Sequence, residues 1–339
     1  MRVPRPSLAF GAAAALSLVL TGCTGPTASG SAELSIVTST NVYADIIAQV
    51  AGDTAKITAI IDDPNQDPHS YEATTRDRLR LSKADLVVIN GGGYDSFMTT
   101  MLEASDAKPE VIDVAAISGL PGSENAGGGA HGGEGDQGNR DDHSHEGDHE
   151  GAADDHAGHD HGEFNEHLWY SVPTMGRLVD DVADHLGEAM PEQKAKITAD
   201  AKAYKNELAG LEETIGTVKV AHGGEKVATT EPVPLWLFDD MGLKNITSPE
   251  FLAAVEEGND VPPLALRDAD AQISSGQAVL LAYNTQAAGP QAEQLRATAE
   301  ASGVPVVDLA ETMPADEQYT EWMGGSIDRI ATALKGHAH

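Results

Sequence analysis

"PEQKAKITADAKAYKNELAGLEETIGTV", residues 191–218, has a proline in its first turn and strong helix formers in the turns that follow. Its large apolar side chains recur at roughly helical intervals, at Ile197, Tyr204, Leu208, Leu211 and Ile215. This pattern predicts the longest uninterrupted helix that can be drawn in the chain. Strand and helix patterns alternate on both sides of it, so we expect the helix to join two α/β units.

The segment before this helix, residues 33–190, alternates between strand and helix patterns. "ELSIVTS" (33–39), "AKITAIID" (55–62) and "DLVVIN" (85–90) are rich in β-branched and apolar residues and predict strands. Between the first two, "NVYADIIAQVAG" (41–52) has its large apolar residues on one helical face and a glycine at its end, which predicts a helix. The alternation favours a parallel sheet with covering helices.

The segment after the long helix, residues 219–336, repeats this alternation. Strands are predicted in "EKVATTE", "LKNITS", "QAVLLAYN" and "VPVVDLA", at residues 225–231, 243–248, 277–284 and 304–310. Helices are predicted between them, at residues 232–242, 249–258 and 289–303. The predicted fold class is therefore α/β, with two α/β domains built on parallel sheets and joined by one long helix.

The first 32 residues have the pattern of an export signal followed by a tether. Two arginines precede the apolar run "LAFGAAAALSLVL", which has the length of a signal-peptide core and is too short to span a bilayer. The run ends in "LTGC", which resembles the lipobox of bacterial lipoproteins. We expect residues 1–22 to be a signal peptide, Cys23 to be acylated, and residues 23–32 to form a lipid-anchored tether of small and polar residues.

Charge and composition exclude several classes of function. The formal net charge is -33 at pH 7, so a polyanionic partner such as nucleic acid is excluded and cations are the natural small partners. Cys23 is the only cysteine, which excludes an intrachain disulfide and a Cys-rich zinc module. The sequence contains neither a His-Glu-x-x-His helix nor a phosphate-binding glycine pattern, so the chain is not predicted to be an enzyme.

Residues 122–162 are rich in glycine, acidic residues and histidine and contain almost no large apolar residues. Such a composition cannot offset the entropy of ordering, so it predicts a disordered loop. Its histidines are irregularly spaced and flanked by acids, which suits several weak, exchanging metal sites. The alternative is a solvated loop without a role in transport. The histidines concerned are His131, His143, His145, His149, His156, His159 and His161.

Four motifs occur in a characteristic order: "DPNQDPHSYEAT", "NEHLWY", "TTEP" before a helix, and "SPEF". With the lipobox and the His-rich tract before "EHLW", they resemble the metal-binding subunits of bacterial ABC importers for zinc and manganese. The resemblance covers residues 33–334. It implies two similar α/β domains joined by one long rigid helix, with the metal site in the interdomain cleft. It also implies an ABC permease and its ATPase as partners, and a monomeric receptor.

The resemblance implies two histidine ligands. His69 follows Asp-Pro in a polar loop after the strand at 55–62, where the family has its first ligand. His167 stands where structured sequence resumes after the acidic tract and corresponds to the second histidine ligand. The neighbouring Leu168 and Trp169 are expected to pack into the core while the imidazole points into the cleft.

The third and fourth ligands depart from the family pattern. Zinc-type relatives commonly have a histidine in third place and manganese-type relatives a glutamate, and this chain has Glu231. In fourth place the family has a carboxylate after the strand that reads "QAVLLAYN" here, where this chain has Asn284. Because an amide is a poor zinc ligand, Asp308 and Glu311, near the end of the strand at 304–310, are alternative donors.

These patterns together predict an extracytoplasmic receptor, lipid-anchored to the outer face of the cell membrane, that binds Zn²⁺ and delivers it to the permease. Two histidines with one or two carboxylates suit tetrahedral Zn²⁺. Carboxylate oxygen is also compatible with Mn²⁺, so a manganese or Fe²⁺ receptor of the same family is the first alternative. A surface metal buffer or adhesin without a role in transport is an alternative of another class.

Overall fold

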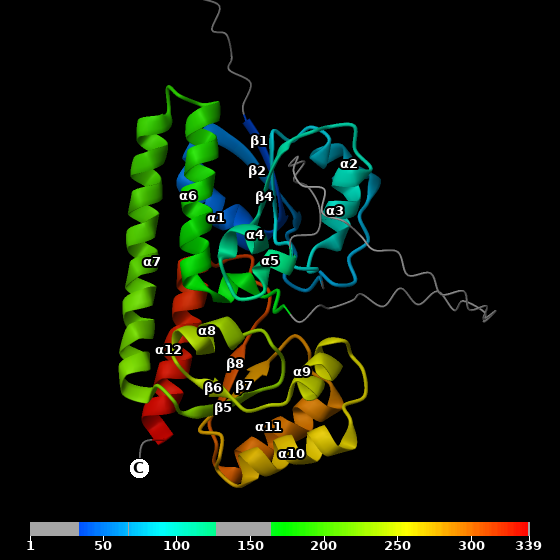
Figure 1. The fold of residues 1–339 in the computed structure, drawn as a ribbon, viewed down its shortest axis with the longest axis vertical. Helices are drawn as coiled ribbons and strands as arrows, with labels where there is room; N and C mark the ends of the chain where they lie inside the picture. The colour runs from blue at the N-terminus through cyan, green and yellow to red at the C-terminus, as the bar shows by residue number, and fades with distance from the viewer. Residues whose placement is uncertain (1–33, 67, 127–163, 338–339) are drawn as a thin grey trace, which may run out of the picture. The chain divides into compact units, whose positions relative to one another are not determined.

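Two four-stranded parallel sheets with the same strand order form the framework of the protein (Figure 1). A computed structural model describes residues 34–66, 68–126 and 164–337. The N-terminal lobe contains the sheet β2-β1-β3-β4 and the C-terminal lobe the sheet β6-β5-β7-β8, so each lobe repeats one topology. The prediction of two similar α/β domains with parallel sheets is confirmed. The strands are β1 Leu34–Thr40, β2 Ala55–Ile61, β3 Leu86–Ile89, β4 Glu110–Asp113, β5 Lys226–Thr229, β6 Lys244–Asn245, β7 Leu281–Asn284 and β8 Val306–Leu309.

Two helix ends in the N-terminal lobe coincide with local sequence signals. The first helix ends at Gly52, whose φ of 53° suits a residue without a Cβ. The second begins with a capping box, in which the side chains of Thr74 and Asp77 each accept a backbone N–H of the other residue. The helices are α1 Asn41–Ala51, α2 Thr75–Leu81, α3 Ser96–Glu103, α4 Val114–Ser118, α5 Ser123–Ala126 and α6 Val172–Ala189, with 3-10 turns at Gly52–Thr54 and Leu168–Tyr170.

The long helix predicted for residues 191–218 is α7, Lys194–His222. It starts three residues later than predicted because Pro191–Gln193 form a turn, and it extends four residues further, to a cap at Gly223. Its buried face includes Ile197, Tyr204, Leu208 and Ile215, as predicted. In Figure 1 it runs beside α6, and it also packs against α1 in the N-terminal lobe and α8 (Leu235–Asp240) in the C-terminal lobe. One hydrophobic core therefore continues through both lobes.

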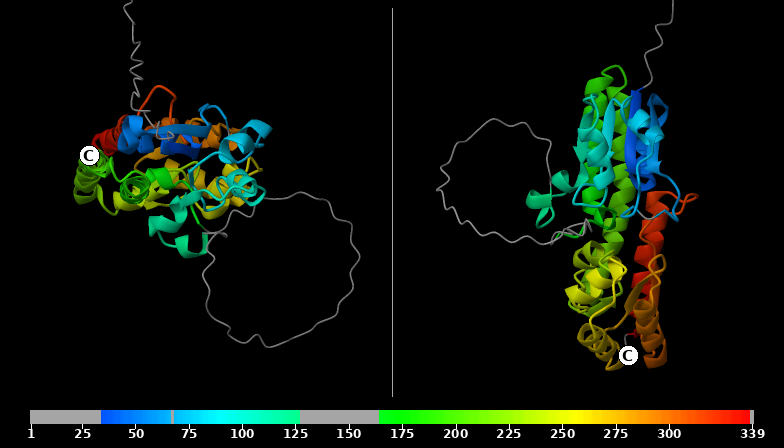
Figure 2. Two further views of the ribbon diagram at one scale, coloured as in Figure 1. Left: turned by 90° about the horizontal axis from the view of Figure 1, so that it is seen from above. Right: turned by 90° about the vertical axis from the view of Figure 1, so that its right-hand side faces the viewer.

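A second helix, α12 (Tyr319–His337), which was not predicted from the sequence, also contacts both lobes. The backbone N–H of Tyr319 donates to Asp45 Oδ2 at 2.9 Å, and its hydroxyl donates to the carbonyl of Trp169 at 2.8 Å, both in the N-terminal lobe. The helix then packs along α7 and β8, and both views of Figure 2 show it as the red segment. The link between the lobes is therefore a pair of helices.

The remaining helices of the C-terminal lobe are α9 Pro249–Glu256, α10 Pro263–Ser274 and α11 Pro290–Ser302. Of these, α10 was not predicted; it packs on α11 and buries Ala269 and Ile273. Helix α5 lies inside the tract predicted to be disordered from residue 122, so that prediction is wrong for its first residues, where a short helix packs on α4. Cys23 and the seven histidines between His131 and His161 lie outside the described residues. In the described part of the chain, no helix has the length and hydropathy needed to cross a membrane.

Candidate functional site

The carboxyl ends of strands in both sheets line one cleft between the lobes. Its walls are formed by the loop after β2, by residues that follow β5, β7 and β8, and by the end of α9, and its volume is about 420 Å³. Loops beyond the carboxyl ends of parallel strands are the usual place for ligands in α/β proteins. The side chains that line the cleft include His69, Glu231, Glu256, Gln286 and Glu311.

His167 lies beside this cleft and is 1% exposed. Its Nδ1 lies 2.8 Å from Asn165 Oδ1, which also accepts the backbone N–H of His167 at 3.2 Å. Asn165 is itself held by the C-terminal lobe, because its side-chain N–H donates to the carbonyl of Pro232 and its carbonyl accepts the indole N–H of Trp236. Since the Asn165 oxygen occupies Nδ1, a metal ion would bind this imidazole through Nε2.

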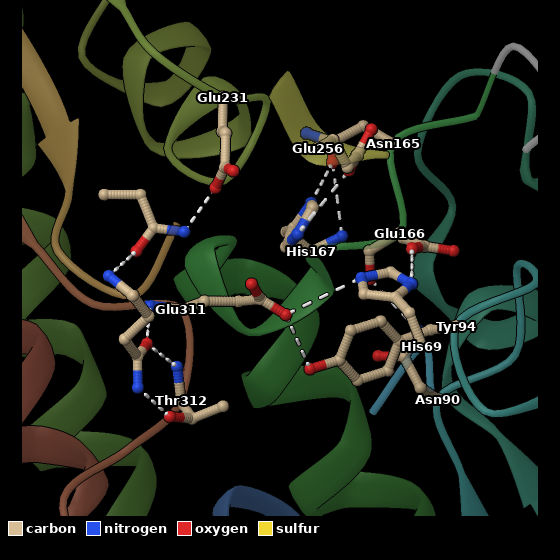
Figure 3. Close-up of polar contacts among 12 residues, drawn as sticks. His69, Asn90, Tyr94, Asn165, Glu166, His167, Glu231, Glu256, Glu311 and Thr312 are labelled. Atoms are coloured by element: carbon tan, nitrogen blue, oxygen red, sulfur yellow. Dashed lines mark hydrogen bonds and ion pairs between the residues drawn. The ribbon is translucent and has the colours of Figure 1, made fainter. Parts of the chain in front are cut away.

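His69 approaches the same point from the loop after β2, as Figure 3 shows. Its Nδ1 lies 3.3 Å from Glu166 Oε1, and its Nε2 lies 3.7 Å from Glu311 Oε1. The edge of the ring packs against Tyr94, with ring centroids 5.2 Å apart. The side chain is 20% exposed. The Glu166 contact therefore leaves Nε2 facing Glu311 across the cleft.

Glu311 completes a group of three donors with the two histidines. One ligand atom from each of His69, His167 and Glu311 lies within 4.8 Å of the others, and this is the group of metal-type donors that the described residues form. The Tyr94 hydroxyl donates to Glu311 Oε1 at 3.2 Å and orients the carboxylate. Two imidazoles and a carboxylate at these separations can converge on a single divalent cation.

The structure places the other residues considered as ligands outside this group. Glu231 lines the cleft, but its Oε2 accepts the side-chain N–H of Asn284, and Asn284 Oδ1 accepts the backbone N–H of Gln286. Asp308 projects from the exposed face of β8 and pairs with Arg296 at 2.9 Å. Glu311, predicted as an alternative donor to Asn284, lies beyond the end of β8 and points into the cleft.

Two further carboxyl groups lie beside the histidines, Glu166 beside His69 and Glu256 beside His167, and neither was predicted to have a role in the site. Burial raises the pKa of Glu166 to about 9, with Glu256 and Glu311 contributing as nearby negative charges. Burial also raises the pKa of Glu256 to about 8, again assisted by Glu311. Glu166 stands next to His167 in the motif "NEHLWY", which was the available signal. Glu256, at the end of α9, carried no such signal. At neutral pH the metal-free cleft therefore holds protons on these carboxyls.

Gln286 connects the loop of His69 with the segment of Glu311. Its Oε1 accepts the backbone N–H groups of Glu311 at 2.7 Å and Thr312 at 2.9 Å. Its Nε2 donates to the carbonyl of Pro64 at 2.9 Å, and the Thr312 hydroxyl donates to the same carbonyl at 2.6 Å. The Gln286 amide as a whole thus joins two segments that carry candidate donors.

Comparisons with known proteins agree with this architecture. Residues 36–333 match the family model described as zinc-uptake complex component A, periplasmic. The manganese-binding lipoprotein MntA of Halalkalibacterium halodurans is 25% identical over 205 residues, 59% of this chain and 55% of that protein. The zinc-binding lipoprotein AdcA of Streptococcus pneumoniae is 25% identical over 223 residues, 63% of this chain and 38% of that protein. The matches thus span about half or less of the length of these relatives.

Solved structures show the same fold. The SBP FpvC of P. aeruginosa in complex with Ni²⁺ is 20% identical with a TM-score of 0.66, and the alignment covers 91% of this chain and 98% of that one. The periplasmic zinc-binding protein TroA of Treponema pallidum is 18% identical with a TM-score of 0.65, covering 89% and 99%. Since the family model matches residues 36–333, well over half of the chain, this protein belongs to the family of zinc-uptake complex component A, periplasmic.

Proposed function

We propose that the protein is an extracytoplasmic receptor that binds Zn²⁺ in the cleft between its lobes and delivers it to a membrane permease driven by an ATPase. The convergence of His69, His167 and Glu311 on one point of the cleft is the observation that carries this proposal. The role is one of binding and release, without a chemical step. The proposed role agrees with the description of the family to which the chain belongs, a zinc-uptake component.

The donor set suits zinc. Imidazole nitrogen and carboxylate oxygen bind Zn²⁺ at about 2.0–2.2 Å, commonly in tetrahedral geometry. His69 and His167 supply two nitrogens, and Glu311 supplies an oxygen within 4.8 Å of both. Glu231 lines the same cleft, where its Oε2 accepts the side-chain N–H of Asn284.

Manganese is the second candidate cargo. Four carboxyl groups, those of Glu166, Glu231, Glu256 and Glu311, lie in or beside the cleft. Carboxylate oxygen is a harder donor than imidazole, and an oxygen-rich site favours Mn²⁺ relative to a site of histidines alone. One relative named above is manganese-binding and the other zinc-binding.

Two features outside the described residues belong to the same proposal. We propose that Cys23 carries the lipid anchor, as suits a chain related to proteins named lipoproteins. The histidines between His131 and His161 would raise the concentration of zinc near the cleft through weak, exchanging sites, because a tethered site has a high effective concentration.

A competition titration tests the proposed cargo. The soluble chain, which is the protein without its signal peptide and Cys23, is first stripped of metal with a chelator. It is then titrated, with and without residues 127–162, with Zn²⁺ and with Mn²⁺ against a calibrated chelator. We expect one tight zinc site in both forms and additional weak sites only when the tract is present. A preference for Mn²⁺ under matched conditions would reassign the cargo. Absence of a tight site from the full soluble chain would contradict the receptor proposal.

Replacing Gln286 with alanine tests whether this side chain positions the segments that carry His69 and Glu311. The variant loses the hydrogen bonds to Glu311, Thr312 and Pro64. Each such bond contributes about 1 kcal/mol, so we expect zinc affinity to fall by about tenfold, mainly through faster dissociation. Stopped-flow release to a chelator measures this rate. The control is Gln294→Ala, which removes an exposed glutamine that bonds to Asp270 within one lobe. Equal dissociation rates for both variants would contradict a role for Gln286 in positioning the donors.

A further inference from the structure

The two histidines of the cleft each face a carboxylate at nearly the same distance. His69 Nε2 lies 3.7 Å from Glu311 Oε1, and His167 Nε2 lies 3.9 Å from Glu256 Oε1. In both cases the other ring nitrogen is occupied, by Glu166 for His69 and by Asn165 for His167. The second pair thus repeats the arrangement of the first, with a carboxylate placed opposite the second ring nitrogen of each histidine.

These distances are close to those of donors that share one metal ion. Two atoms bound to the same ion at about 2.1 Å, at tetrahedral or octahedral angles, lie roughly 3.0–3.5 Å apart. Glu256 Oε1 and His167 Nε2 need to approach by only a few tenths of an ångström to reach that range. Glu256 also lines the cleft, and its side chain is 15% exposed. Glu256 therefore stands at the edge of the group formed by His69, His167 and Glu311, with His167 as the donor it faces.

We propose that Glu256 is a direct ligand of the metal in the cleft, alongside His69, His167 and Glu311; this rests on the function proposed above. Each lobe then supplies two donors, the histidines from the N-terminal lobe and the carboxylates from the C-terminal lobe. A bound ion holds the lobes together through four bonds. The carboxylate of Glu231 remains bonded to Asn284 in the wall of the cleft.

The position of Glu256 in its helix supports a cation-dependent role. It is the last residue of α9, and the cap that follows is another acid, Glu257. The carboxyl end of a helix carries partial negative charge, so an acid there is disfavoured unless a cation lies nearby. Phe251, Leu252 and Ala254 are buried and anchor the helix in the C-terminal lobe. The fold thus holds an acid at an unfavourable helix end, facing the Nε2 atom of a buried histidine.

The test compares Glu256→Gln and Glu256→Asp with the matched control Glu257→Gln in the full soluble chain. Zinc affinity is measured by chelator competition, and the absorption spectrum of the Co²⁺-loaded protein reports the ligand field. Groups that only orient a ligand change metal affinity by about 10- to 100-fold. We expect Glu256→Gln to weaken zinc binding by about 100-fold or more and to shift the Co²⁺ bands, with changes of less than about threefold for Glu257→Gln.

The aspartate variant separates ligation from charge. It keeps the negative charge but withdraws the carboxylate by one methylene, so a ligand is lost while the electrostatic attraction persists. We expect it to weaken zinc binding nearly as much as the glutamine variant. Normal affinity in Glu256→Asp, or an unchanged Co²⁺ spectrum in Glu256→Gln, would overturn direct ligation. If the unmodified chain binds no zinc tightly, the proposed function fails; if it binds tightly and Glu256→Gln does so equally, only the assignment of Glu256 fails. Thermal unfolding of the metal-free variants confirms that each is folded.

Discussion

His167→Ala is expected to weaken zinc binding by roughly 100- to 1,000-fold, and His69→Ala by a similar factor. Zinc held by four protein donors has an apparent binding free energy of about 10–16 kcal/mol, or roughly 2.5–4 kcal/mol for each donor. Losing one donor therefore costs two to three powers of ten in affinity. His69 and His167 each offer one nitrogen to the group that includes Glu311, so neither loss is compensated by the other.

The control for this pair is His185→Ala. His185 lies on α6, with its Nδ1 2.9 Å from the carbonyl of Asp181 and its side chain 32% exposed, away from the cleft. We expect zinc affinity unchanged in this variant when measured by the same chelator competition. Because His167 is buried among core side chains, thermal unfolding of its metal-free variant must be measured as well, whereas His69 lies in a loop and its removal leaves the core intact. Tight zinc binding by a folded His69→Ala or His167→Ala protein would remove that residue from the site.

Zinc affinity is expected to rise steeply between pH 7 and pH 9. In the metal-free cleft the pKa of Glu166 is about 9 and that of Glu256 about 8, both raised first by burial. A bound cation favours the charged carboxylates, so binding at neutral pH expels their protons. Each displaced proton makes affinity rise about tenfold per pH unit, and two make it rise about 100-fold. Histidine alone, with an ordinary pKa of about 6.5, predicts a nearly flat profile above pH 7.

The number of displaced protons can be counted directly. Calorimetry of zinc binding in buffers with different ionisation enthalpies gives this number, and we expect a value between one and two at pH 7. Glu166→Gln removes one titrating carboxyl and is expected to lower the count by about one. A flat affinity between pH 7 and pH 9 would contradict protonation of the metal-free cleft.

The same carboxyls determine how the stability of the metal-free protein depends on pH. An acid whose pKa is higher in the folded than in the unfolded state binds more protons when folded, so it stabilises the fold below the raised pKa. For Glu166 and Glu256 this contribution is complete below about pH 4.5 and is lost as pH rises through about 8 to 9. The melting temperature of the metal-free protein is therefore expected to fall progressively from about pH 4.5 to about pH 9. The increase in melting temperature caused by zinc binding is expected to grow over the same range.

Most of the fold followed from local patterns, and the exceptions have identifiable causes. Alternating strand and helix signals located both sheets, and apolar spacing located α7 with its buried face. Helix α12 was not predicted; it contains adjacent glycines, Gly324 and Gly325, which weaken an isolated helix. Burial of Trp322, Ile327 and Ile330 against the core stabilises it in the folded chain. Tertiary packing thus outweighed local propensity at that position.

For the site, sequence by itself determined which loops carry the histidines, because His69 and His167 stand in motifs next to strand or core signals that can be read locally. Only the tertiary structure decided which acids face them. Glu311 and Glu256 are 55 residues apart, and their approach to the histidines depends on how the two sheets and α9 pack across the cleft. Glu231 and Asn284, which stand at the third and fourth ligand positions of the family pattern, bond to each other. Donor type is a property of one residue, whereas convergence on an ion is a property of the packed lobes.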